Sequence, residues 1–337
     1  MTLKTVHFVY ATPNTLLDKF SMRLMGRKLF HPSWDKLSWP TPLKAPLSIT
    51  FHTARHLSKR YRVRLYDLRE RLDIVAEKGD ILLGHAWPDS KSLLWRAMQD
   101  ENFASRYLIS PYNHDACQVG WLSPLVEQCD KFFAICGHFW IDSFDQSPLA
   151  PFRDKVVQLS MGIDTTNYPV VKSSFNPPGK RRFFYVGRGG HEKGIDLLEE
   201  LAREVPGFQG GYISLGGEIK GWDKICDPTD LTPELMRSIA EQYDIFINMS
   251  RADAQVTTVL EAMSWGFPVA CTHESGYSQE KSLYYLSLDD GKMNASVITE
   301  LQRMESSKLA EVSRLNRTLV ESQYSWERFL STLEGNL

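Results

Sequence analysis

Two short segments of this 337-residue chain combine residue types that suit binding of a nucleotide diphosphate. The first, residues 187–194, reads GRGGHEKG and carries the cations Arg188 and Lys193. Glycines such as Gly187 let the backbone approach an anion closely, and a helix that starts near Gly194 attracts negative charge. The two cations suit a diphosphate that no metal neutralises. The segment lacks the Gly-Lys-Ser/Thr of a P-loop and does not match the Gly-x-Gly-x-x-Gly dinucleotide spacing.

The second segment, residues 250–263, reads SRADAQVTTVLEAM and runs from a predicted strand into a predicted helix. Asp253 precedes this helix and can hold hydroxyl groups of a sugar. Glu261 lies one turn beyond the helix start, where its apolar neighbours imply partial burial, and it can accept hydrogen bonds from ribose hydroxyls. We expect three residues at the helix start to offer backbone amides to an anion: Val256, Thr257 and Thr258.

These segments carry a family resemblance. FYVGRGGHEKGIDLLEEL and DIFINMSRADAQVTTVLEAMSWGFPVACT resemble the nucleotide-binding half of retaining GT-B glycosyltransferases of the family 4-like, Glu-x7-Glu type, which includes sucrose synthases. Residues 156–168 and 324–329 are similar to the hinge and the final helix of that family. The resemblance covers about half of the chain. It departs at two points, because Asp253 replaces the first glutamate and Ala254-Gln255-Val256 replaces a Gly-Phe-Gly.

The resemblance implies a role for each matched residue. Arg188 and Lys193 would bind the diphosphate, Glu261 the ribose, and Asp253 the hydroxyls of the donor sugar. Leu231 would line the base pocket. The implied donor is a UDP-sugar such as UDP-glucose, which is a substrate and not a cofactor. No resident cofactor is expected. No metal is expected either, because no Asp-x-Asp pair or His/Cys ligand spacing occurs in the chain.

The first half of the chain contributes two candidate histidines. His114 follows a predicted strand, at a place where the family usually has a histidine that contacts the donor sugar; an imidazole there can also orient the acceptor. His85 occupies a similar position after another strand, with weaker support. The Gly-Gly turn that the family often has after its first strand is replaced by Ala11-Thr12-Pro13-Asn14.

These loops must be positioned by strands that alternate with helices, which is the pattern of parallel α/β sheets. The predicted strands of the first half are residues 5–10, 62–66, 80–84, 106–110, 131–135 and 155–159. Helices are expected between them, for example at 90–103 and 119–129. After a polar Pro/Gly-rich stretch at 172–181, the predicted strands are 182–187, 211–216, 244–249 and 268–272. The predicted helices of the second half are 194–204, 233–242, 256–265 and, broken near Tyr324–Ser325, 292–335. Thr232 followed by Pro233 predicts an N-cap and first-turn pair at the start of 233–242.

The alternation predicts an α/β fold of two doubly wound Rossmann-like domains facing across a cleft. Residues 1–171 would form the acceptor-binding domain and residues 172–337 the nucleotide-sugar-binding domain, with 172–181 as the linker. We expect the C-terminal helix, 324–337, to pack back toward the N-terminal domain. Ligands of open α/β sheets bind at the carboxyl ends of the strands, so the chemistry is expected in the loops there.

Charge distribution gives the only clue to the acceptor. The net charge is −2, yet residues 1–71 hold fourteen basic and four acidic side chains, a net +10. This basic block predicts an anionic partner such as a membrane surface or a lipid-linked acceptor. Nucleic acid is not expected, because no recognition motif accompanies the charge. The five scattered cysteines and the lack of a spanning segment indicate a cytoplasmic chain with reduced thiols, and the basic block allows a peripheral place on the inner face of the membrane.

The sequence therefore predicts a metal-independent, retaining hexosyltransferase of polysaccharide or glycolipid biosynthesis, which moves a sugar to a glycan, lipid-linked or other hydroxyl acceptor. Two alternatives stay open. An NAD(P)-dependent enzyme would use Gly187–Gly194 as its dinucleotide loop, despite the mismatched glycine spacing. A non-catalytic sugar-nucleotide-binding protein would explain the altered segment after Asp253.

Overall fold

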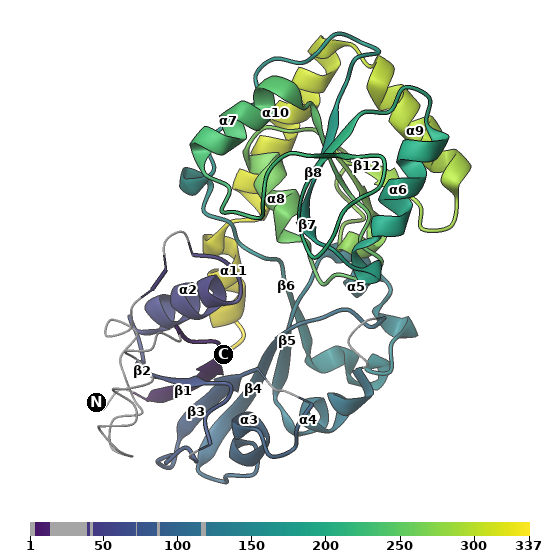
Figure 1. Cartoon of the computed structure of the whole chain (residues 1–337). Coiled ribbons are helices and arrows are strands. Elements are labelled where there is room, and N and C mark those ends of the chain that lie inside the picture. The colour runs from purple at the N-terminus through teal and green to yellow at the C-terminus, as the bar shows by residue number, and fades with distance from the viewer. Residues whose placement is uncertain (1–3, 14–38, 41–42, 72, 86–87, 116–118) are drawn as a thin grey trace. The chain divides into compact units, whose positions relative to one another are not determined.

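A computed structural model describes residues 4–13, 39–40, 43–71, 73–85, 88–115 and 119–337 of the chain. The structure divides into two compact units. The first comprises Met1–Ile135, Ser143–Leu159 and Phe329–Leu337, and the second Cys136–Asp142 and Ser160–Arg328. Each unit is built on one parallel six-stranded sheet with helices beside it (Figure 1). The predicted pair of α/β domains is confirmed.

The sheet of the first unit has the strand order β2-β1-β3-β4-β5-β6. Its strands are β1 (Thr5–Tyr10), β2 (Arg62–Asp67), β3 (Asp80–Gly84), β4 (Phe103–Pro111), β5 (Lys131–Ile135) and β6 (Val156–Leu159). Every residue of β1 and β3 is buried, as expected for inner strands of a parallel sheet that is covered on both faces. All six strands predicted from the first half are present.

The helices of the first unit are shorter than predicted. They are α2 (Leu47–Leu57), α3 (Leu93–Ala97), α4 (Ser123–Gln128) and the 3-10 turns η3 (Val119–Trp121), η4 (Phe144–Gln146) and η5 (Ala150–Lys155). The helix predicted at 90–103 is confined to α3, because Asp89 accepts the Lys91 N–H in a turn and β4 already begins at Phe103. The helix predicted at 119–129 is split, with Pro124 in the first turn of α4.

The sheet of the second unit has the order β12-β11-β10-β7-β8-β9. Its strands are β7 (Phe183–Arg188), β8 (Gly210–Leu215), β9 (Asp223–Lys224), β10 (Ile245–Asn248), β11 (Val269–Thr272) and β12 (Tyr284–Leu286). Its helices are α5 (His138–Asp142), η6 (Thr165–Asn167), η7 (His191–Lys193), α6 (Ile195–Glu204), α7 (Pro233–Gln242), α8 (Thr257–Ser264), η8 (His273–Ser275), α9 (Gly291–Arg303), α10 (Ser306–Gln323) and the first residues of α11 (Trp326–Glu334). The four predicted strands and the break at Tyr324–Ser325 are confirmed. The short strands β9 and β12 were not predicted.

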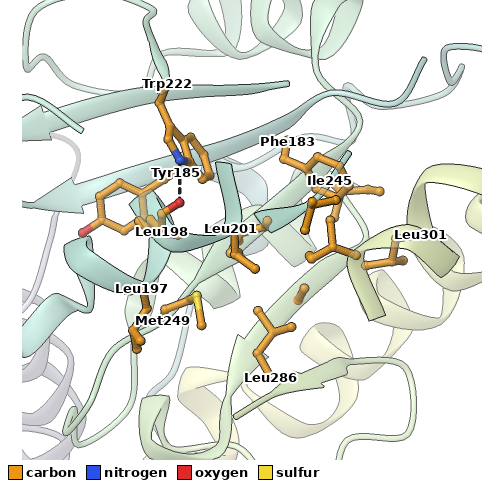
Figure 2. Close-up of a cluster of buried hydrophobic side chains, with 14 of the residues drawn as sticks. Phe183, Tyr185, Leu197, Leu198, Leu201, Trp222, Ile245, Met249, Leu286 and Leu301 are labelled. Atoms are coloured by element: carbon orange, nitrogen blue, oxygen red, sulfur yellow. Dashed lines mark hydrogen bonds between the residues drawn. The ribbon is translucent and has the colours of Figure 1, made fainter. Parts of the chain in front are cut away.

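Apolar side chains from β7 and the helices next to it form the core of this unit (Figure 2). Leu197, Leu198 and Leu201 lie on one face of α6, at the spacing that an amphipathic helix turns toward a sheet. The indole N–H of Trp222 donates to the Leu198 carbonyl oxygen over 2.8 Å, which gives this buried ring its polar partner. The core thereby fixes β7 and α6, the two elements that flank the glycine-rich loop.

The stretch predicted as a linker, 172–181, is packed into the second unit. The buried carboxylate of Asp244 accepts hydrogen bonds from Lys172 Nζ at 3.0 Å and from Asn176 N and Nδ2 at 2.9 and 2.8 Å. Desolvation lowers the pKa of Lys172, and the neighbouring Asp244 opposes that shift. These contacts pack the stretch into the second unit. That unit includes Ser160–Arg328, so the division falls before the expected boundary at 171/172.

The last part of the chain returns to the first unit from Phe329 onward. Glu334 pairs with His56 Nε2 and Arg60 Nη1, each at 2.7 Å, and the Tyr107 hydroxyl donates to the Leu337 carbonyl oxygen. These contacts hold the end of α11 within the first unit, as the sequence predicts for the C-terminal helix.

Candidate active site

The two segments singled out in the sequence come after neighbouring strands of the second sheet. β7 pairs with β8 on one side and with β10 on the other, so the direction of the strand order changes between β7 and β10. Crevices at such switch points are where open α/β sheets bind ligands. Gly187–Gly194 comprises the last two residues of β7 and the loop after it, and Ser250–Val256 follows β10, so the topology brings both to one site.

Close backbone packing explains the glycines of the first loop. Gly194 has φ +66°, and a Cβ atom there would lie 2.0 Å from the Met249 carbonyl oxygen. Gly189 donates its N–H to the Leu215 carbonyl oxygen, and a Cβ atom would lie 2.5 Å from the Gly216 oxygen. A side chain at either position would push the loop away from its neighbours. α6 begins directly after Gly194, as predicted.

The second loop joins the first through an ion pair. The ammonium of Lys193 contacts the Asp253 carboxylate, and both side chains are largely buried, with exposures of 14% and 26%. The two residues that were assigned to a diphosphate and to a sugar therefore lie in direct contact. An incoming phosphate would compete with Asp253 for Lys193, because both are anions.

Both backbone polar groups of Asp253, its N–H and its carbonyl oxygen, form hydrogen bonds. Its N–H donates to the Glu274 carbonyl oxygen at 2.9 Å, and its own carbonyl oxygen accepts from the Trp140 indole N–H at 2.6 Å. Trp140 lies on α5 and is fully buried. The neighbouring Gly137 N–H donates to the Ala254 carbonyl oxygen. Sequence reasoning missed this support, and no local pattern reports it, since Trp140 and Asp253 are 113 positions apart.

The start of α8 differs from the prediction at one residue. The Val256 N–H donates to the Ser275 carbonyl oxygen at 3.0 Å, so it is not the free amide that was expected. Thr257 and Thr258 are the first two residues of α8, where N–H groups have no acceptor within the helix. The anion site predicted here therefore rests on Thr257 and Thr258.

The departure from Gly-Phe-Gly after Asp253 has a structural reason. Gln255 is buried, and its Oε1 accepts the Met161 N–H at 2.7 Å. The side chain thus holds the segment at the start of the second unit. Gln255 stands in place of the phenylalanine, whose side chain could not accept this hydrogen bond.

Glu261 and Leu231 belong to the second unit as well. The Glu261 carboxylate accepts from the Tyr168 hydroxyl at 3.4 Å, and burial, together with the Glu261 charge, raises the pKa of Tyr168. Leu231 is half-buried and precedes Thr232, whose hydroxyl caps α7 by accepting the Leu235 N–H. The predicted cap is confirmed. Arg188 ends β7 with an exposed side chain, and its carbonyl oxygen accepts from the Tyr185 hydroxyl at 2.7 Å.

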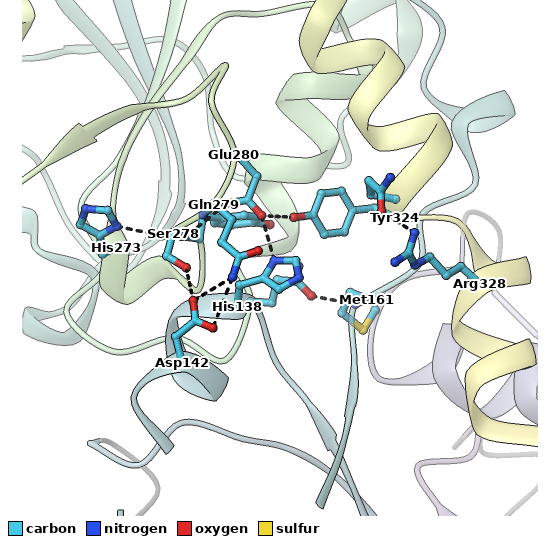
Figure 3. A network of polar contacts seen from close by, with 12 residues as sticks. His138, Asp142, Met161, His273, Ser278, Gln279, Glu280, Tyr324 and Arg328 are labelled. Atoms are coloured by element: carbon cyan, nitrogen blue, oxygen red, sulfur yellow. Dashed lines mark hydrogen bonds and ion pairs between the residues drawn. The ribbon is translucent and has the colours of Figure 1, made fainter. Parts of the chain in front are cut away.

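A polar network joins α5 to residues near Glu280 and Tyr324 (Figure 3). Glu280 is buried and accepts hydrogen bonds from the His138 ring and the Tyr324 hydroxyl. Burial alone would raise the pKa of Glu280, but these hydrogen bonds outweigh it and hold that pKa at about 2. The hydrogen bond to Glu280 raises the pKa of His138. The pair anchors α5, the helix that carries Trp140.

The two candidate histidines, His85 and His114, belong to the first unit. His85 lies after β3, beside β1 at the switch point of that sheet, and burial lowers its pKa to about 4. His114 lies three residues beyond β4; Tyr112 Oη and Ser143 Oγ are 3.4 and 3.5 Å from its ring nitrogens. Burial also lowers the pKa of His114. The topology thus places His85, and not His114, at the switch point of the first sheet.

The remaining expectations concern the basic segment, metals, thiols and membrane spans. Residues 14–38, a large part of the basic block 1–71, lie outside the described residues. Within the described residues no cluster of three or more His, Cys, Asp or Glu side chains could hold a metal. The four cysteines in the described part of the chain form no disulfide bond with one another: Cys129, Cys136, Cys226 and Cys271. No helix among the described residues is long and apolar enough to cross a membrane.

No protein-family model matches the sequence, and no curated protein matches it. Many solved structures share its fold. The pneumococcal O-GlcNAc transferase GtfA, solved with UDP and GlcNAc, superposes with a TM-score of 0.55 at 15% identity over 77% of this chain. This chain spans 56% of the GtfA chain. Anabaena HepE, in complex with UDP and glucose, gives 0.58 at 10% identity, with 98% of both chains covered.

The N-terminal domain of the Candida albicans trehalose-6-phosphate phosphatase gives a TM-score of 0.63 at 13% identity, covering 98% of this chain and 96% of that one. The chain therefore has the two-sheet α/β fold of GT-B glycosyltransferases, as the resemblance implied. At these identities the likeness establishes the fold, and the chemistry has to be argued from the site itself.

Proposed function

We propose that this protein is a retaining glycosyltransferase that moves a sugar from a UDP-sugar to a hydroxyl acceptor without a metal ion. One observation carries the proposal: Lys193 and Asp253, the side chains expected to bind phosphate and sugar hydroxyls, form an ion pair in the loops that follow β7 and β10 at the switch point. The fold shared with HepE, solved with UDP and glucose, supports the choice of donor.

In this proposal the diphosphate contacts Arg188, Lys193 and the N–H groups of Thr257 and Thr258. Glu261 accepts hydrogen bonds from the ribose, and Leu231 borders the base. Asp253, released from Lys193 when phosphate takes its place, binds hydroxyls of the sugar. Gly189 and Gly194 keep the loop that carries Lys193 packed against its neighbours, since no side chain fits at either position.

The reaction breaks the bond between the anomeric carbon and the β-phosphate oxygen through an oxocarbenium-like transition state. Negative charge grows on the leaving diphosphate, and the two cations and the start of α8 stabilise it; such preorganised stabilisation is commonly the largest contribution to catalysis. A phosphate oxygen of the leaving group takes the proton of the acceptor hydroxyl. The acceptor then attacks from the face that the diphosphate leaves, so the anomeric configuration is retained.

The acceptor is proposed from charge. A block with a net +10 within residues 1–71 suits a glycan or lipid-linked acceptor that carries negative charge, or an anionic membrane surface that presents it.

A non-catalytic sugar-nucleotide-binding protein is the second candidate. Ala254-Gln255-Val256 replaces the family's Gly-Phe-Gly, and Gln255 is committed to the Met161 N–H. A domain of a protein named as a phosphatase shares the fold as well. This candidate predicts nucleotide binding without any transfer.

Two measurements test the proposal. Calorimetric titration with UDP, GDP, ADP and NAD should show tightest binding for UDP, whereas preference for NAD would favour a dehydrogenase. Incubation with UDP-sugars and an acceptor panel, followed by NMR of the product, should show transfer with an unchanged anomeric configuration. EDTA should leave the rate intact. UDP binding without transfer to any acceptor would favour the non-catalytic candidate.

A further inference from the structure

We propose that Arg251 is a positioning residue that holds the glycine-rich loop in its phosphate-binding form and does not itself bind phosphate. The inference rests on the proposed function, because it assigns the 187–194 loop to a diphosphate. It concerns a residue to which the proposed reaction gives no role.

Arg251 reaches from the loop after β10 to the loop after β7 at three points. Its backbone N–H donates to the Glu192 carbonyl oxygen at 2.9 Å. Its Nε donates to the His191 carbonyl oxygen at 3.2 Å, and its Nη2 to the Asp196 carboxylate at 2.5 Å. Three acceptors of one short segment are therefore bound by a single arginine, which presents several donors in a fixed plane.

The contacts bracket Lys193. His191 and Glu192 lie before it in the 3-10 turn η7, and Asp196 lies after it in the first turn of α6. Gly194, in the left-handed conformation, lies between Lys193 and α6. A glycine-rich turn of this kind would otherwise sample many backbone conformations, and ordering it would cost conformational entropy when the ligand binds. The arginine removes that cost in advance, which strengthens binding without touching the ligand.

The guanidinium is already committed within the protein. Asp196 neutralises its charge, and the Arg251 side chain is 24% exposed. A phosphate ligand would have to displace both the carboxylate of Asp196 and the carbonyl oxygen of His191. Arg188 and Lys193 sit on the loop itself and need no such exchange. The positioning role and a direct phosphate contact therefore predict opposite effects on UDP binding when Asp196 is substituted.

The experiment compares Asp196→Asn with Arg251→Ala. If Arg251 positions the loop, Asp196→Asn weakens UDP binding by about twofold to threefold, because the ion pair becomes an ordinary hydrogen bond. If Arg251 bound phosphate directly, the same change would free its charge and tighten UDP binding. Arg251→Ala should weaken UDP binding about tenfold, and Arg251→Lys, which keeps one donor, should restore part of the loss. Calorimetry measures the dissociation constants.

A second readout needs no ligand. Hydrogen exchange of the amides in 187–196 should quicken in Arg251→Ala while exchange across β8 and α7 stays unchanged. Arg203→Ala is the matched control, since Arg203 lies on α6 with 67% exposure and pairs only with its neighbour Glu204 among the described residues.

Tighter UDP binding in Asp196→Asn, or unchanged exchange of the loop in Arg251→Ala, would overturn the inference. Absence of UDP binding by the wild-type protein would instead overturn the proposed function. The exchange experiment would then still decide whether Arg251 orders the loop.

Discussion

The two sheets are alike around their first strands, but they carry different loops there. In each sheet the first strand lies between its second strand and a later one: β1 between β2 and β3, and β7 between β8 and β10. After β7 and β10 come a glycine-rich loop, two cations and Asp253. After β1 and β3 come Ala11-Thr12-Pro13 and His85, a half-buried histidine with a lowered pKa. The two sheets therefore share a switch point in their topology and differ in the residues that their loops place there.

Removing a cation from the second unit should have the largest effect on the reaction. We expect Arg188→Ala and Lys193→Ala each to lower turnover at least about a hundredfold, the scale of losing one charge-stabilising group in the transition state. Steady-state rates with a UDP-sugar measure this. Lys180→Ala, at an exposed position of the same unit, is the control and should leave the rate unchanged. Turnover near the wild-type value in either loop variant would remove that residue from the proposed mechanism.

Asp253→Asn should separate binding of the nucleotide from transfer of the sugar. Because Lys193 loses its partner, UDP should bind up to about fivefold more tightly, which is the scale of a partly exposed ion pair. Transfer should fall at least about tenfold, since the sugar loses a charged acceptor. Calorimetry with UDP and rates with the UDP-sugar give the two values, and Asp227→Asn is a control at an exposed acid. Weaker binding of UDP itself would show that the ion pair builds the phosphate site and does not compete with phosphate.

The histidines of the two units should give opposite responses to pH. His85 has a pKa lowered to about 4, so the unfolded chain takes up its proton first, and the first unit loses stability as pH falls from about 6.5 toward 4. His138 has a raised pKa, so its contribution to the second unit is present below about 6.5 and disappears as pH rises through its folded value.

Hydrogen exchange at about pH 6 and about pH 8.5 measures the stability of each unit separately on the two sides of the ordinary histidine pKa. The loss caused by His138→Gln should be larger at the lower pH, and confined to the second unit. His85→Asn should flatten the pH dependence of the first unit. His191→Gln, at a side chain with 79% exposure, is the control. Equal losses at both pH values would mean that His138 acts through packing and not through its charge.

Substitution of the residues that precede helices should give the smallest difference between the two units, measured as a change in unfolding free energy. Thr232 caps α7 with its hydroxyl, so Thr232→Ala should cost about 1 kcal/mol of unfolding free energy. Ser92 precedes α3 without a side-chain capping hydrogen bond, so Ser92→Ala should change the unfolding free energy by less than about 0.5 kcal/mol. Thermal unfolding checks both, with Thr229→Ala as the control for α7. A larger loss in Ser92→Ala would contradict the difference.

Features written in short stretches of sequence were predicted well. The strand before the glycine-rich loop, the Thr232 cap and the break at Tyr324–Ser325 all depend on residues within one or two turns of each other. Each is a local pattern of apolar spacing, capping or chain breaking, and so it can be recognised without knowing the rest of the fold.

Features that depend on distant partners were missed. Residues 172–181 have the composition of a linker, but the buried Asp244 draws Lys172 and Asn176 into the second unit. Val256 has the sequence position of a free helix-start amide, yet Ser275 supplies an acceptor from another loop. Trp140 supports Asp253 from 113 positions away. Such pairs are set by tertiary packing, and the sequence near either partner contains no pattern from which the contact could be predicted.

Hydrogen exchange with and without saturating UDP reports where the nucleotide binds. We predict slower exchange in residues 187–196 and 251–261 of the second unit, and no change around His85 and His114. The protection should disappear in Lys193→Ala at the same UDP concentration. Protection that lies in the first unit, or that survives unchanged in Lys193→Ala, would contradict the assignment of the nucleotide site.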